Sequence, residues 1–387
     1  MTVTATERRQ AKSTKPNRRR GGAPESYSAT FWFLLVIVGV LTLLGGVMVL
    51  SASAAEAISE SSSAWSIFRR QVLWIALGLS AMAITMRIDY HRWQAVAPLA
   101  IWVAGIMLWL PLIPGLGVSI NGARRWVILG GISVQPSEFA KVAVILSVAA
   151  VLARKTKPIE NFRLTLVPIA IATVWVMLPL IFQPHLGAIM VIGVTVFAML
   201  FFGGARFMPL AAAASVGVGG IAAMIIAFPW RRDRFFAFLD PWSAPDTAGY
   251  QPLQSLYAIT SGGLTGVGLG NSYAKWGFLP FAHTDFIFAV IAEELGLLGA
   301  LFVLTLFLLL GFAGMAAALN APDRFGVLLA TGVTAWIVFQ ALLNIGAVIS
   351  WLPVTGVTLP FLSFGGSSLV ASLAGIGIVL NVARQGR

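Results

Sequence analysis

Long apolar runs separated by short polar segments dominate the chain. Ten such runs lie at about 31–50, 71–86, 95–113, 138–153, 164–182, 186–203, 208–228, 285–312, 327–350 and 366–382. A helix of about 20 apolar residues is long enough to cross the hydrocarbon core of a bilayer. The pattern therefore predicts ten membrane-spanning helices joined by mostly short loops.

Composition supports the same class of protein. The 387 residues are 58% hydrophobic and 10% charged, and the mean hydropathy is +0.88, which is far outside the range of soluble domains. We predict an all-α polytopic membrane protein with a single helical bundle. The chain has no cysteine, which excludes a disulfide framework and a thiolate metal site. The first run, 31–50, is too long for a signal peptide and is interpreted as a retained span.

Basic residues predict the orientation of the bundle. A tail rich in Arg and Lys precedes the first span, which marks the cytoplasmic side more economically than it indicates nucleic-acid binding. An even number of spans returns the C-terminus to that side. We therefore expect a disordered cytoplasmic tail at 1–28, a ten-helix domain at 29–383 and a cytoplasmic end at 384–387.

Nine cations fall on the predicted outer face, where they oppose the usual topology signal. They are Arg69, Arg70, Arg124, Arg125, Lys141, Arg231, Arg232, Arg234 and Lys275. Binding of a phosphate-bearing ligand is one task that suits them. The alternative is pairing with outer-leaflet lipid or with each other.

The longest loop, 229–283, joins spans 7 and 8 on the outer side and exceeds the length of a simple connection, which favours a functional role. Its part 252–261 has the pattern of a short interfacial helix, and the glycines of SGGLTGVGLGNS permit turns with positive φ. The glycine spacing is similar to a dinucleotide fingerprint. Because no strand precedes it, we expect no nucleotide site.

Asp285 lies at the mouth of the eighth run, where a carboxylate is costly and indicates chemistry. It can act as a general base if burial raises its pKa, or as a cation ligand if it stays ionised. The alternative is that Thr284 or Asp285 caps the helix. His283 is a candidate for orienting a substrate hydroxyl, or an ordinary polar contact. Glu293 and Glu294 lie too deep to share the reacting atom, and we expect them to hold the bundle together or to contact another subunit.

Two further segments predict a polar cavity. In PSEFAK, Glu138 and Lys141 share a helix face, which predicts a buried ion pair; a surface pair is the alternative. The segment 352–368 contains two prolines and paired glycines. Irregular backbone at membrane depth is tolerated where it lines protein or water, so we expect a cavity wall.

Eight motifs together resemble one family across nearly the whole chain. They are MVLSASA at 48–54, FRRQ at 68–71, NGARRW at 121–126, QPSEFAK at 135–141, FLDPW at 238–242, GYQ at 249–251, HTDFIFAVIAEELG at 283–296, and LPVTG followed by FGGSS within 352–368. The chain is similar to the SEDS family (shape, elongation, division and sporulation), the FtsW/RodA type of peptidoglycan polymerase.

This resemblance implies a SEDS-type bundle that polymerises lipid II, with the family's essential aspartate at Asp285. The aspartate would take a proton from the 4-hydroxyl of the acceptor sugar, which attacks the donor's anomeric carbon and releases undecaprenyl diphosphate. Stabilisation of the developing phosphate charge suits outer-face cations and leaves room for a divalent ion, Mg²⁺ or Mn²⁺. The candidate substrate-binding residues are Arg70, Arg124, Arg125, Glu138, Lys141, Arg231, Arg234, Lys275, His283, Ser367 and Ser368.

The resemblance also implies partners: a class B penicillin-binding protein acting as transpeptidase, and other divisome or elongasome proteins. MVLSASA favours the FtsW branch and a role in septal wall synthesis. Four positions depart from the common family pattern, namely Phe281, His185, Ser350 and Phe364.

Two other functions remain open from the sequence. A lipid II flippase would also have ten spans, broken helices and intramembrane charges, and it needs important polar groups on both sides of the bilayer. A non-catalytic divisome scaffold would not need Asp285.

Overall fold

The computed structural model describes residues 28–59, 64–120, 123–154 and 162–386. The predicted basic tail, except for its last residue, and the final Arg387 lie outside the described residues. Each of the ten predicted spans corresponds to a helix. The helices are α1 (Ala29–Ser59), α2 (Ala64–Arg87), α3 (His91–Trp109), α4 (Pro136–Ala153), α5 (Phe162–Phe182), α6 (Leu186–Phe202), α7 (Phe207–Ala227), α10 (Ile287–Leu319), α11 (Arg324–Val348) and α12 (Gly366–Gln385).

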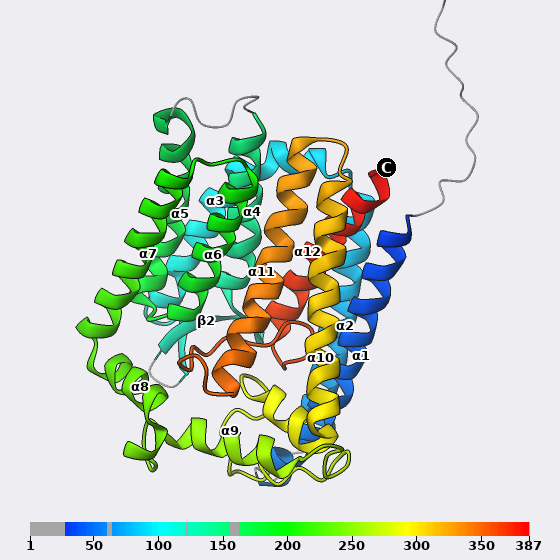
Figure 1. Cartoon of the computed structure of the whole chain (residues 1–387), viewed down its shortest axis with the longest axis vertical. Coiled ribbons are helices and arrows are strands. Elements are labelled where there is room, and N and C mark those ends of the chain that lie inside the picture. The colour runs from blue at the N-terminus through cyan, green and yellow to red at the C-terminus, as the bar shows by residue number, and fades with distance from the viewer. Residues whose placement is uncertain (1–27, 60–63, 121–122, 155–161, 387) are drawn as a thin grey trace, which may run out of the picture.

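In the part of the chain that the structure describes, nine of these helices are long and apolar enough to cross a membrane, and α6 is a shorter apolar helix. The ten helices form one bundle (Figure 1). The α12 span is 89% buried and the α4 span 78% buried, whereas α7 at the edge is only 6% buried. The centre of the bundle is therefore built by α4, α11 and α12, and the outer helices present their apolar faces to lipid.

Glycines bring α2 and α12 into close contact. A Cβ added to Gly377 would lie 2.0 Å from Thr85 Oγ1, and one added to Gly366 would lie 2.0 Å from the Trp74 ring. Small residues at such crossings let two helices approach closely in lipid, where van der Waals packing replaces the hydrophobic effect as the main attraction.

A small sheet between α3 and α4 is the main element that the apolar pattern does not predict. Strands β1 (Gly117–Ile120), β2 (Ala123–Leu129) and β3 (Ile132–Val134) are antiparallel in the order β1-β2-β3. A short 3-10 helix, η1 (Leu110–Leu112), precedes the sheet. The described part of the NGARRW motif lies on β2. Because successive side chains of a strand point to opposite faces of the sheet, Arg124 and Arg125 point in opposite directions.

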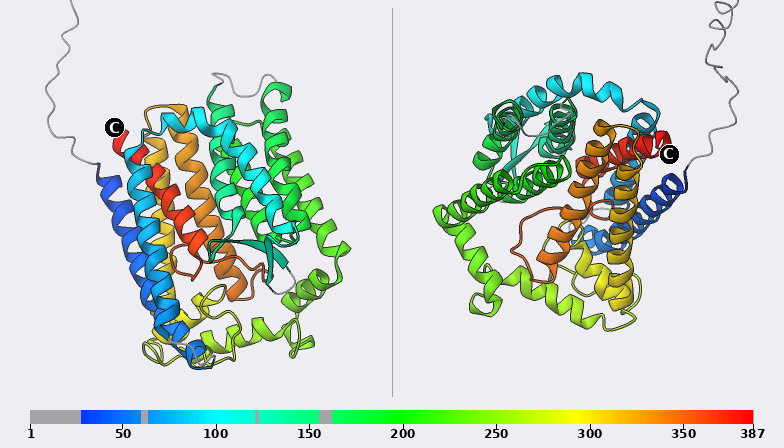
Figure 2. Two further views of the ribbon diagram at one scale, coloured as in Figure 1. Left: turned by 180° about the vertical axis from the view of Figure 1, so that it is seen from behind. Right: turned by 45° about the horizontal axis from the view of Figure 1, so that its top comes forward.

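The long loop between α7 and α10 contains α8 (Pro229–Leu239), η2 (Pro241–Ser243) and α9 (Tyr250–Ser261). The helix predicted at 252–261 is confirmed as α9, which begins two residues earlier than expected, whereas α8 was not predicted. These helices and the sheet lie at one end of the bundle, and the start of α1 and the C-terminus lie at the other (Figures 1 and 2).

Helix α10 is broken at Gly296, which has φ of 69°. The break frees the carbonyls of Glu293 and Glu294, which accept hydrogen bonds from Val267 N at 3.0 Å and Gly268 N at 3.1 Å. On the other side of the break, the N–H groups of residues 297 and 298 donate to the carbonyls of residues 263 and 264. Backbone groups of the glycine-rich segment thus supply the hydrogen bonds that replace two missing i to i−4 bonds of the helix. This segment therefore has a structural role.

Candidate functional site

Asp285 lies immediately before α10, at the same end of the bundle as the sheet. The helix is capped by Phe286, and no side chain makes a capping hydrogen bond. The capping alternative for Thr284 and Asp285 is therefore wrong. Asp285 is half-buried, so its carboxylate is both partly desolvated and reachable.

The backbone around Asp285 is held by three successive hydrogen bonds. The carbonyl of His283 accepts from Phe364 N at 2.9 Å, and that of Thr284 accepts from Ser363 Oγ at 2.6 Å. The carbonyl of Asp285 accepts from Asn344 Nδ2 at 2.7 Å. These bonds come from α11 and from the irregular segment between α11 and α12.

Arg125 approaches the same carboxylate from β2. Its Nε donates to Gln183 O at 3.3 Å and its Nη2 to Pro184 O at 2.6 Å. A Cβ added to Gly356 would lie 3.6 Å from Arg125 Nη1 and 3.7 Å from Asp285 Oδ2. The guanidinium and the carboxylate therefore flank Gly356, whose φ of +70° also favours glycine.

The electrostatics of this pair suit proton transfer. Burial raises the pKa of Asp285, and the positive charges of Arg125 and Arg234 oppose that rise. Burial lowers the pKa of Arg125 to about 10, an effect that Asp285 opposes, so the guanidinium stays charged at neutral pH. A carboxylate with a raised pKa beside fixed cations combines a base with a stabiliser of negative charge.

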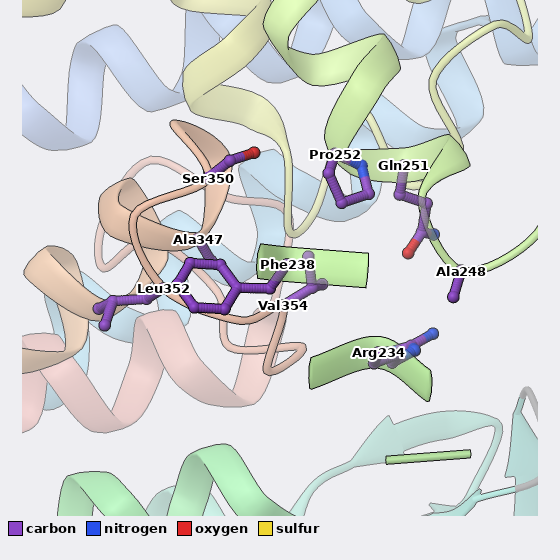
Figure 3. Close-up of a pocket in the computed structure, with 9 residues that line it drawn as sticks. All are labelled: Arg234, Phe238, Ala248, Gln251, Pro252, Ala347, Ser350, Leu352 and Val354. Carbon is purple, nitrogen blue, oxygen red and sulfur yellow. The ribbon is translucent and has the colours of Figure 1, made fainter. Parts of the chain in front are cut away.

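Helix α8 adds two more cations. Arg231 is buried with its guanidinium 4.6 Å from the centre of the Phe228 ring. Arg234 is half-buried and lines a small pocket between α8, α9 and the end of α11 (Figure 3). Gln251 and Ser350 are the other polar residues of this mainly apolar pocket. Burial lowers the pKa of Arg234 and Asp285 opposes that effect, which links the pocket electrostatically to the carboxylate.

The predicted ion pair of PSEFAK is buried. Lys141 Nζ lies 2.8 Å from both carboxylate oxygens of Glu138 and 2.6 Å from Gln340 Oε1. Gln340 also accepts from Trp336 Nε1 at 2.8 Å and donates to Thr358 O at 3.0 Å. The surface-pair alternative is therefore wrong, and the pair belongs to a network that joins α4, α11 and the irregular segment.

Ser367 and Ser368 begin α12 and belong to the same region. Ser367 Oγ accepts from Gln135 N at 3.0 Å, and Ser368 Oγ accepts from Thr358 Oγ1 at 3.0 Å. Both hydroxyls therefore connect the start of α12 to the elements that surround the Glu138–Lys141 pair.

Three candidate residues lie outside this cluster. Arg70 and Arg124 are exposed, on α2 and β2 respectively, and within the described residues no hydrogen bond or ion pair joins them to Asp285. Lys275 is buried, and its ammonium donates to Glu294 Oε1 at 3.0 Å, Ser51 Oγ at 3.1 Å and Gly270 O at 2.6 Å. These contacts use its three donors, so we leave Lys275 out of the proposed binding surface.

Glu293 and Glu294 hold the long loop onto α10. Glu293 accepts from Ser272 Oγ and from Tyr273 N at 2.9 Å, and Glu294 pairs with Lys275. The expectation that these acids hold the bundle together is confirmed.

Three departures from the family pattern have local features of note. His185 caps α6 by accepting from Ala188 N at 3.4 Å, and it lies 2.9 Å from Gln135 Nε2. Ser350 has φ of 56°, in the left-handed region that disfavours residues with a side chain. Phe281 also has a positive φ, of 62°.

Sequence reasoning missed Gly356, Ser363 and the roles of Gln340 and Asn344. One signal was present: Gln340 and Asn344 are polar residues four positions apart in an apolar run, which places them on one helix face. Ser363 and Gly356 lie in irregular backbone, where spacing carries no such information.

The donors around Asp285 do not fit a metal site built by the protein alone. Within the described residues, no group of three or more His, Cys, Asp or Glu side chains is placed to hold a metal ion. The cations that act electrostatically on Asp285 are instead Arg125 and Arg234. A divalent ion needs several oxygen ligands, so we assign no step to one.

The sequence and the fold both have clear relatives. The profile of the FtsW/RodA/SpoVE family, described as "Cell cycle protein", matches residues 31–387. "Stage V sporulation protein E" of Bacillus subtilis (strain 168) is 41% identical over 355 residues, which cover 92% of this chain and 97% of that protein. "Probable peptidoglycan glycosyltransferase FtsW" of Mycobacterium tuberculosis (strain ATCC 25618 / H37Rv) is 38% identical over 373 residues, covering 96% and 71% respectively.

A solved structure agrees with this assignment. One chain of the structure described as "Structural coordination of polymerization and crosslinking by a peptidoglycan synthase complex" is similar, with a TM-score of 0.77 and 32% identity. The match covers 93% of this chain and 98% of that chain. The protein is therefore a multi-pass membrane protein that belongs to the FtsW/RodA/SpoVE family.

Proposed function

We propose that this chain is a peptidoglycan glycosyltransferase that polymerises lipid II, with Asp285 as the general base. The observation that carries the proposal is the placement of the Asp285 carboxylate and the Arg125 guanidinium within 4 Å of the same point, the Cβ position of Gly356. The name of the M. tuberculosis relative and the synthase complex of the structural neighbour support the same reaction.

In the proposed reaction, Asp285 takes the proton of the acceptor sugar's 4-hydroxyl. The hydroxyl oxygen forms a bond to the anomeric carbon of the donor chain, and the bond from that carbon to the diphosphate oxygen breaks. Undecaprenyl diphosphate leaves with the electron pair. A single displacement inverts the α-linked donor to a β-linked product.

The cations of β2 and α8 stabilise the leaving group. Negative charge develops on the diphosphate as the bond breaks, and a guanidinium in a partly water-excluded site stabilises such charge. Arg125 is the first candidate because its charge has the largest effect of any neighbour on the pKa of Asp285. Arg234 is the second, because it lines the adjacent pocket and interacts with Asp285.

We propose that the end bearing Asp285 faces outward and that both termini are cytoplasmic. Six described basic residues lie near helix ends on the side of the bundle opposite the sheet. They are Arg87, Arg92, Arg154, Arg206, Arg324 and Arg384. An excess of Lys and Arg on short loops marks the cytoplasmic side.

We further propose that the enzyme acts in septal wall synthesis together with a class B penicillin-binding protein. The FtsW names of relatives and the MVLSASA motif support the division role. The neighbour from a complex that couples polymerisation and crosslinking supports a transpeptidase partner.

Purified protein incubated with lipid II, with and without a transpeptidase partner, tests the activity. The proposal predicts glycan strands on a gel from wild type. Lipid II crossing vesicle membranes without strand formation would favour the flippase. Neither activity, with partner binding retained, would favour the scaffold.

A further inference from the structure

Two buried polar side chains join the segment that carries Asp285 to the irregular segment that carries Gly356. The first is Asn344 of α11. Its Nδ2 donates to Asp285 O and to Val357 O, both at 2.7 Å. Val357 follows Gly356 directly. One amide group therefore contacts both the backbone of Asp285 and the backbone next to Gly356.

Ser363 makes a second bridge of the same kind. Its Oγ donates to Thr284 O at 2.6 Å and accepts from Leu359 N at 2.8 Å. Each of two adjacent residues, Thr284 and Asp285, is therefore tied by one side chain to a backbone group of the opposite segment. Because the two bridges hold adjacent residues, they restrain both the distance between the two segments and the rotation of one segment relative to the other.

Stability alone does not explain an asparagine at position 344. Asn344 is 2% exposed, and its Oδ1 has no hydrogen-bond partner among the described residues. A buried acceptor without a partner costs free energy of folding. Both N–H donors of the amide form hydrogen bonds. We take these two bonds to be the reason that position 344 carries an asparagine.

We propose that Asn344 and Ser363 are positioning residues that set the separation and alignment of the Asp285 carboxylate relative to Arg125 across Gly356. This inference rests on the proposed function. It assigns the two residues no contact with substrate: they act by holding the base where the acceptor hydroxyl and the leaving phosphate meet.

The variants Asn344→Ala and Ser363→Ala test the proposal in the full-length protein with lipid II. Misplacement of a reacting group by about 1 Å costs roughly 100-fold, so we expect kcat to fall by about 10- to 100-fold. KM should change by less than about threefold, because the cations that bind phosphate are untouched. The acid limb of the pH profile should keep its position, because the charged neighbours of Asp285 are unchanged.

Matched controls separate positioning from general stability. Asn381 also uses its buried amide between elements, donating to Met86 O at 2.6 Å and accepting from Tyr90 N at 2.9 Å at the opposite end of the bundle. Thr85 Oγ1 donates to Ala374 O at 2.9 Å, between α2 and α12. Asn381→Ala and Thr85→Val should lower thermal stability and leave kcat per folded molecule near wild type.

The results separate this inference from the proposed function. If Asp285→Asn is inactive but folded Asn344 and Ser363 variants keep wild-type kcat, the positioning role is overturned and the base remains. A loss of kcat in all four variants in proportion to lost thermal stability also overturns it. If Asn344→Ala yields no folded protein, Asn344→Leu keeps the volume and removes the paired donors without adding a charge, and the same expectations apply.

Discussion

Asp285 and Arg125 come from different parts of the chain, and both side chains end within 4 Å of the position that a Cβ of Gly356 would occupy. The carboxylate precedes α10, whereas the guanidinium extends from β2 and is anchored by the carbonyls of residues 183 and 184. This arrangement places a base and a cation beside a residue that has no side chain, and it makes specific predictions.

Arg125→Gln should move the acid limb of kcat/KM to higher pH. The active form of Asp285 is deprotonated, so the rate rises as pH passes through its pKa. Arg125 lowers that pKa, and its removal leaves the rise caused by burial less opposed. A pH–rate profile measures the change. Arg124→Gln, on the neighbouring exposed position of β2, is the control and should leave the limb in place; an equal movement in both variants would contradict the assignment.

Gly356→Ala should reduce kcat/KM by about 10- to 100-fold, because its methyl group would occupy the gap between base and cation. Some of the effect comes from the backbone, since φ is +70°. Gly130→Ala isolates that part: Gly130 has φ of +58° and nothing within 4 Å of an added Cβ. Steady-state kinetics of both variants provide the comparison, and similar losses would mean that the gap is unimportant.

Lys275→Met should destabilise the protein by about 3 to 5 kcal/mol, because it leaves the buried Glu294 carboxylate without its cation. Glu294→Gln should have a similar effect. The double variant should be more stable than the sum of the two losses predicts, because neither charge is then left alone. Thermal unfolding of the three variants tests this, and strictly additive losses would argue against a coupled pair.

Ser350→Gly should raise the free energy of unfolding by about 1 kcal/mol, because glycine adopts a φ of 56° without the Cβ conflict. Ser350→Ala keeps the Cβ and should show no such gain. Chemical or thermal unfolding measures both, and equal stability of the two variants would show that the backbone conformation costs nothing.

The sequence predicted the spans well because span length follows from bilayer thickness. Each apolar run became a helix, and the cost of a carboxylate at the mouth of α10 correctly singled out Asp285 as partly desolvated. The sequence alone did not show which of the outer-face cations act on Asp285 and which have another partner. Arg125 and Arg234 act on Asp285, whereas Lys275 is used by Glu294, and this difference depends on tertiary contacts.

The sheet and α8 could not be found in the same way. Strands of three to seven residues between two spans give a short alternation that the neighbouring apolar runs obscure. The bridges made by Asn344 and Ser363 could not be predicted either. Their partners are mainly backbone groups, which are the same for nearly every residue type and so leave no signal in the sequence.

The most direct test of the central claim is the single-turnover rate of strand elongation by Asp285→Asn, measured beside lipid II binding. Asp240→Asn is the control, since Asp240 is an exposed carboxylate of the same loop that caps η2. We expect Asp285→Asn to bind lipid II and to lose about 100- to 10,000-fold in rate, as removal of a general base does, while Asp240→Asn stays near wild type. An Asp285→Asn enzyme that elongates strands at the wild-type rate would contradict the account.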